Sequence, residues 1–168
     1  MSISMYQASV PVFVRGLTNL RGILAKAASH AQTRKIQESV LFNARLYPDM
    51  FPLSRQVQIA SDHAKGVARL AGQEPPPYED NEQSFADLAA RIDRTLAFLN
   101  TLTPGEIDGS EERLVSRKLG GKMMTFKGQV FLLQVALPNF YFHSTTAYAI
   151  LRHNGVELGK SDFIGSLE

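Results

Sequence analysis

The sequence predicts an all-α protein, an up-down four-helix bundle that forms a single domain over residues 1–168. Two observations carry this prediction. Apolar residues recur at steps of three and four along four long segments, and connections rich in proline or glycine join these segments. Each apolar stripe is too narrow to be buried alone, but four stripes can share one core. The chain length also fits one core of ordinary size.

The four long helices are expected at four places in the chain. The first runs from about Met5 to Ala31, the second from about Leu53 to Ala71, the third from about Ser84 to Leu102 and the last from about Gln129 to Asn154. Pro138 lies inside the last of these helices. We expect it to remove one backbone hydrogen bond and to bend the helix.

Smaller elements are expected to decorate the bundle. A short extra helix is predicted from Thr33 to about Leu46, ahead of two prolines that break the pattern. The stretch from Glu106 to Gly128 has no helical stripe. Within it, Gly120-Gly121 separates two short mixed segments, which predicts a small β-hairpin before the last helix. The tail after Gly155 carries further apolar residues and is expected to pack back onto the helices.

Composition excludes several classes of protein. The formal net charge is only +2, with 44% hydrophobic and 20% charged residues, which argues against a disordered tail and a basic nucleic-acid arm. There is no cysteine, so disulfides, thiolate metal sites and cysteine nucleophiles are excluded. No apolar run reaches the length of a membrane-spanning helix, and the start of the chain lacks the features of a secretory signal. We therefore expect a cytoplasmic protein with neither nucleic acid nor membrane as partner.

The histidines supply the candidate chemistry. None of the four forms an HExxH or HxxxH pair, so the sequence holds no self-sufficient zinc motif. Asn139 and His143 are four residues apart on one expected helix, so their side chains share a face. His63 lies on the second long helix and is the natural third member. Helix bundles build metal sites in this way, from facing helices.

Two interpretations of this cluster stay open. In the first, His63 and His143 hold a divalent metal such as zinc, nickel or iron, and Asn139, Asp62 or water completes the shell. In the second, His143 is a buried histidine bonded to a backbone or hydroxyl group. The second is favoured because a neutral amide oxygen is a weak ligand for transition metals. Without a metal, Asn139, His143 and Tyr148 would line a small-ligand pocket between the second and fourth long helices.

The last third of the chain also resembles a known family. The segments 137–143, 146–156 and 158–163, together with 51–58 and 65–72, look like an uncharacterised branch of the DinB/YfiT-like metalloenzyme superfamily, a branch catalogued as a domain of unknown function. The resemblance covers nearly the whole chain. It implies a DinB-like four-helix bundle, commonly found as a homodimer, and the first helix is a candidate contact.

The resemblance also bears on the metal. Better-known relatives bind a divalent metal with three histidines, one on the second helix and an HxxxH pair on the fourth. That pair falls here on Asn139 and His143, so its first histidine is replaced, while His63 lies in about the right region. The expectation is a small-ligand-binding protein with a degenerate or absent metal site. The alternatives are a divalent-metal-dependent small-molecule transferase or hydrolase, and a structural or regulatory dimer.

Overall fold

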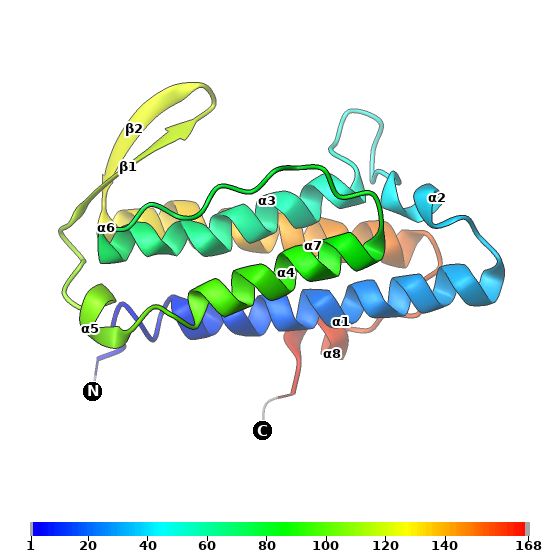
Figure 1. The fold of residues 1–168 in the computed structure, drawn as a ribbon, viewed down its shortest axis with the longest axis horizontal. Coiled ribbons are helices and arrows are strands. Elements are labelled where there is room, and N and C mark those ends of the chain that lie inside the picture. Colours follow the sequence, from blue (N-terminus) through cyan, green and yellow to red (C-terminus); the bar gives the residue numbers. More distant parts are fainter. Residues whose placement is uncertain (1, 167–168) are drawn as a thin grey trace.

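The computed structural model describes residues 2–166 and contains four long helices packed around one core (Figure 1). Each long helix falls where the apolar periodicity predicts one, so the all-α bundle is confirmed. The second helix finishes in a tighter 3₁₀ segment, η1, which ends at Gly72 in the left-handed conformation. The bounds are α1 Val10–Arg34, α3 Leu53–Lys65 with η1 Gly66–Ala71, α4 Phe85–Leu99 and α7 Leu137–His153.

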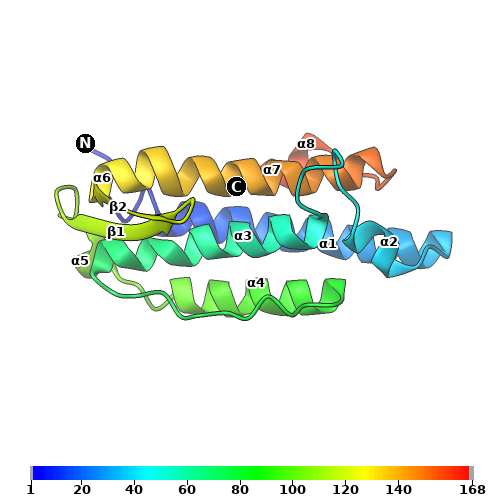
Figure 2. The same ribbon diagram turned by 90° about the horizontal axis from the view of Figure 1, so that it is seen from above.

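One connection spans the length of the bundle. The segment 72–84 leaves the end of η1 and runs back along the helices, so that α3 and α4 point in the same direction (Figures 1 and 2). Contacts agree with this path. Arg55 near the start of α3 pairs with Asp80 of the crossover, and the backbone N–H of Phe85 donates to Glu38 of the short helix α2 (Glu38–Phe42). The bundle thus has a long crossover where a simple up-down succession would have a short turn.

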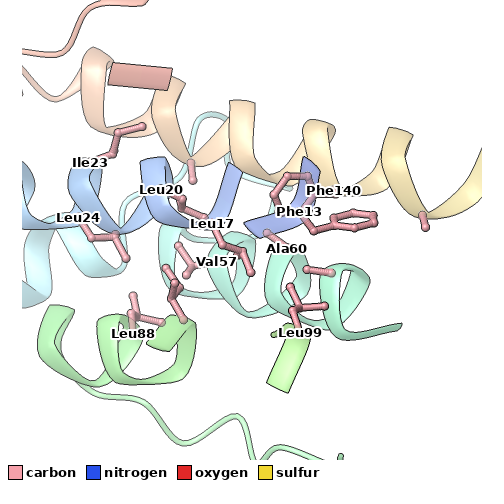
Figure 3. Packing of buried hydrophobic residues seen from close by; sticks show 14 of the residues in the cluster. Phe13, Leu17, Leu20, Ile23, Leu24, Val57, Ala60, Leu88, Leu99 and Phe140 are labelled. Atoms are coloured by element: carbon pink, nitrogen blue, oxygen red, sulfur yellow. The ribbon is translucent and has the colours of Figure 1, made fainter. Parts of the chain in front are cut away.

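The inner faces of the four long helices meet in one hydrophobic core (Figure 3). Full burial of each large aliphatic or aromatic side chain contributes about 1.5–3 kcal/mol. The rings of Phe13 on α1 and Phe140 on α7 meet edge to face with centroids 5.1 Å apart. Gly16 makes this close approach possible, because a Cβ there would lie 2.6 Å from Phe140 Cε1. The labelled core residues include Leu17, Leu20 and Leu24 of α1, Val57 and Ala60 of α3, and Leu88 and Leu99 of α4.

The predicted β-hairpin is present and projects from one end of the bundle (Figure 1). Strand β1 (Leu114–Leu119) pairs antiparallel with β2 (Lys122–Lys127), after a short helix α5 (Pro104–Ile107). Gly120 and Gly121 form the turn with φ angles of +54° and +85°. Both values favour glycine and suit the tight turns that match the twist of a hairpin.

The last long helix begins irregularly. A short helix α6 (Gly128–Val130) passes into η2 (Phe131–Ala136), whose turns are π-helical, and then into α7. Pro138 sits in the first turn of α7, immediately after the wide turns. The structure thus has wider turns directly before Pro138, and such turns are a known site of helix distortion; the expected bend itself stays a prediction.

The extra helix is shorter than predicted. We expected it from Thr33 to Leu46, but α1 continues to Arg34 and ends at Lys35, a non-glycine residue with a left-handed φ of +54°. Only residues Glu38–Phe42 then form α2. The sequence carries no proline or glycine between the two helices, so nothing in it marked this boundary.

The tail packs onto the bundle as expected. Helix α8 (Lys160–Ile164) lies against α1, where Asn19 donates to the Phe163 carbonyl at 3.0 Å and Lys26 pairs with Asp162 at 2.6 Å. None of the helices in residues 2–166 is both long and apolar enough to cross a membrane.

Candidate functional site

His63 and His143 face each other across the interface between α3 and α7. Their rings are nearly parallel, with an interplanar angle of 18° and centroids 6.1 Å apart. Both side chains are buried, with exposed fractions of 5% and 9%. His63 of the second long helix thus lies beside His143 of the last one, on facing helices.

A hydrogen bond from α3 fixes the protonation state of His143. Gln56 Nε2 donates to the backbone carbonyl of Phe51 at 3.0 Å, which leaves Gln56 Oε1 as the atom that faces the imidazole. His143 Nδ1 lies 2.7 Å from this oxygen, so Nδ1 carries the proton and donates it. The remaining nitrogen, His143 Nε2, is then an acceptor with a lone pair.

A residue of the hairpin fixes the opposite tautomer on His63. Arg117 of β1 places a guanidinium nitrogen 3.2 Å from His63 Nδ1. Arginine can only donate, so Nδ1 accepts and the proton of the neutral ring lies on Nε2. The pair thus presents one N–H donor, on His63, and one acceptor, on His143.

Both imidazoles are held neutral. Burial, then the positive charge of Arg117 and the neighbouring His143, lower the pKa of His63 from 6.5 to about 3. Burial and the charge of Arg55 lower the pKa of His143 as well. Neither Nε2 atom belongs to the buried side-chain atoms of residues 2–166 that lack a hydrogen-bond partner. Both rings are nevertheless largely buried, so each Nε2 has little contact with solvent.

A second polar cluster lies on the other side of α3. Arg91 of α4 is fully buried and pairs with Asp62 at 2.9 Å, Asp80 at 3.1 Å and Glu82 at 3.0 Å. Two of these carboxylates belong to the crossover, which the arginine therefore ties to α3 and α4. Lys65, 2.9 Å from Asp62, adds a second cation. We name these residues the Arg91 cluster; each carboxylate in it is paired with a cation, although Arg91 Nε has no hydrogen-bond partner, and such a set of ion pairs is typical of a structural network.

Comparison with known proteins places the chain in a family. A model described as "Domain of unknown function (DUF1993)" matches residues 5–164. The chain belongs to the DUF1993 family. A solved structure of a DinB family member protein from Shewanella denitrificans is 42% identical, with a TM-score of 0.86, over 96% of this chain and 92% of that one. No curated protein matches the chain. The expected DinB-like bundle is thus confirmed at the level of family and fold.

Two of the predicted site residues of this DUF1993 protein are not joined to the histidine pair. The Asn139 amide donates to the Val135 carbonyl of its own helix at 2.7 Å. Tyr148 lies five residues after His143, about 140° further around α7. Its ring packs against Phe163, and its hydroxyl lies 3.5 Å from the Leu158 carbonyl. The side of α7 that carries Tyr148 therefore meets the tail and not α3.

The donors around the histidine pair do not fit a transition-metal site. In residues 2–166 no group of three His, Asp or Glu side chains gathers in a way that could hold a metal ion. The guanidinium of Arg117 also lies against His63, where a second cation would be repelled. His143 alone has the arrangement of a metal-binding histidine, with one nitrogen bonded to an oxygen and the other free.

Gln56, Arg117 and Arg91 were missed by sequence reasoning. Arg117 contacts His63, 54 residues away in the sequence, and Gln56 contacts His143, 87 residues away. No local sequence pattern predicts contacts at such separations. Arg91 did carry a signal, because it lies three residues after Leu88 and one before Ile92, on the apolar face of α4. A charged residue at such a position needs buried partners.

Proposed function

We propose that this DUF1993 protein binds a small polar organic molecule between α3 and α7 without a metal, at the Nε2 nitrogens of His63 and His143. The observation that carries this proposal is the pair of opposite tautomers. One ring offers an N–H and the other a lone pair, and a partner group in the protein fixes each choice. At the helix interface a ligand group can replace solvent at this donor and this acceptor.

The chemistry of the pair selects the ligand group. A group that both accepts and donates a hydrogen bond, such as a primary amide or a hydroxyl, complements the two Nε2 atoms. Gln56 and Arg117 act as positioning residues, since each holds one ring through its Nδ1 atom. Because both rings stay neutral near pH 7, the site does not attract the ligand through a charge of its own.

The second candidate is a divalent-metal-dependent transferase or hydrolase. The bond from His143 to Gln56 favours it, because metal-bound histidines commonly donate their other N–H to an oxygen. It requires a metal to displace Arg117 from His63, or to bind through His143 with few other protein donors. The absence of a third acidic or imidazole donor among residues 2–166 counts against it.

Nitrogen NMR of the imidazole rings tests both candidates. Acetamide, which carries one donor and one acceptor group, is expected to shift the Nε2 signals of His63 and His143 in a saturable way. The exposed ring of His153 serves as the internal control and should not respond. Gln56→Leu frees His143 to adopt either tautomer and should weaken the response.

Metal titration completes this test. Zinc or nickel added to chelator-treated protein should show no stoichiometric binding in calorimetry, and chelator should leave the melting temperature unchanged. Stoichiometric metal binding that disappears in His143→Ala would support the second candidate and refute the first. Imidazole signals that ignore acetamide at saturating concentration would also refute the first.

A further inference from the structure

An opening lies where α1, α7 and the tail helix α8 meet. It is a groove of about 260 Å³ whose lining includes Val12 and Gly16 of α1, Tyr141 of α7, and Phe163 and Ile164 of α8. Four of these five residues carry apolar or aromatic side chains, and the fifth is a glycine. The groove faces away from α3, so it is separate from the histidine pair and does not depend on the function proposed above.

The groove continues into a small internal space. Gly16, Tyr141 and Phe163 line both the groove and a deeper void of about 20 Å³. The void is otherwise walled by core side chains of α1 and α7, with one polar exception. That exception is Ser144, whose side chain is 3% exposed and whose Oγ has no hydrogen-bond partner within the protein.

Ser144 differs from two other buried helical hydroxyls, although Ser110 Oγ, which lies in a loop, is also buried without a partner. Buried helical hydroxyls elsewhere return to the carbonyl four residues earlier: Ser61 bonds to Val57 at 3.0 Å, and Thr95 bonds to Arg91 at 2.9 Å. Ser144 could reach the Phe140 carbonyl in the same way but does not. A buried hydroxyl without a partner costs about 1–3 kcal/mol. A group that enters the void from the groove would remove this cost.

The walls indicate an uncharged occupant. Arg15 and Asn19 also line the groove, but the Arg15 guanidinium already donates to the Ile164 carbonyl and the Asn19 amide to the Phe163 carbonyl, both at 3.0 Å. These bonds hold α8 in place, and solvent screens the charge of Arg15 because its side chain is exposed. The volume of the groove limits the ligand to about one aromatic ring, since an apolar cavity of about 150 Å³ accepts benzene.

We propose that the groove between α1, α7 and α8 binds a small uncharged molecule about the size of one aromatic ring, whose single hydroxyl or carbonyl group bonds to Ser144 Oγ. The ring lies against Tyr141 and Phe163, and the polar group enters the void. The side chains of Arg15 and Asn19 hold α8 in place through its backbone carbonyls and so fix this wall of the groove.

The pair p-cresol and toluene tests the proposal, because the two molecules differ only in one hydroxyl. Methyl NMR of the full chain follows Val12, Ile23 and Ile164. We expect p-cresol to shift these signals in a saturable way, with an affinity roughly 2- to 10-fold higher than that of toluene. In Ser144→Ala this preference should vanish. Thr145→Ala, an exposed hydroxyl on the same helix, is the matched control and should keep it.

Three results would overturn the proposal. Methyl signals that ignore both probes would mean that the space holds water only. Equal binding of both molecules to the wild type and to Ser144→Ala would mean that the hydroxyl has no role. Signals that move with protein concentration alone would show that a second copy of the chain covers the groove.

Discussion

The neutral state of His63 makes the stability of the fold depend on pH. In the unfolded chain its pKa is near 6.5, whereas in the folded protein burial and the charge of Arg117 lower the pKa to about 3. Below pH 6.5 the unfolded chain binds a proton at His63, whereas the folded protein does not until the pH nears 3. Stability is therefore lost as the pH falls from 6.5 toward 3, at about 1.4 kcal/mol for each pH unit.

The magnitude follows from these two values. Between about pH 7 and about pH 5, His63 alone should cost about 2 kcal/mol of unfolding free energy. Any folded-state pKa below about 4 gives the same loss over this interval, because the unfolded-state pKa sets it. Urea unfolding at the two pH values measures the loss. His63→Gln removes the titration and keeps an oxygen that can accept from Arg117.

The variant comparison isolates His63 from the other groups that titrate in this range. His63→Gln should lose about 2 kcal/mol less than the wild type on acidification. His153→Gln replaces an exposed histidine and should behave as the wild type does. If His63→Gln loses as much stability as the wild type, the imidazole is not held neutral and the tautomer argument for the site fails.

Two further predictions concern the packing. Arg91→Met removes the buried cation that Asp62, Asp80 and Glu82 share and should cost about 3–5 kcal/mol in urea unfolding; Arg94→Met, whose side chain is 59% exposed, should cost less than about 1 kcal/mol. Equal losses would show that the Arg91 cluster does not hold the crossover. In Gly128→Ala the new Cβ would lie 2.0 Å from the Ser110 carbonyl oxygen, so a thermal scan should show a loss of a few kcal/mol. Gly22→Ala has open space in mid-helix and should gain about 0.5–1 kcal/mol; a similar loss in both variants would contradict the steric argument.

Periodicity predicted the helices because burial acts on every turn of an amphipathic segment. The hairpin was also predictable, since the φ angles of Gly120 and Gly121 are ones that few other residues adopt. The course of the crossover was not predictable. Asp80 and Glu82 look like ordinary charged loop residues in the sequence, and only the structure shows that they pair with Arg91. Local patterns report which face of a helix is buried, and they do not report what lies opposite.

The candidate site, like the fold, could be predicted only in part. The spacing within each helix was enough to turn His63 and His143 toward a shared interface, and the structure brings their rings together. Their protonation states depend on Gln56 and Arg117, which come from distant parts of the chain. Tyr148 was assigned to the same pocket although its place on α7 turns it toward the tail.

The π-helical turns ahead of Pro138 give α7 a point at which the chain tolerates a change of length. A π turn closes with one residue more than an α turn. A related chain one residue shorter between Gly128 and Pro138 would close this stretch as ordinary helix and still aim His143 at α3. The same deletion within Leu137–His153 would rotate every later side chain by about 100° and carry the apolar face away from the core.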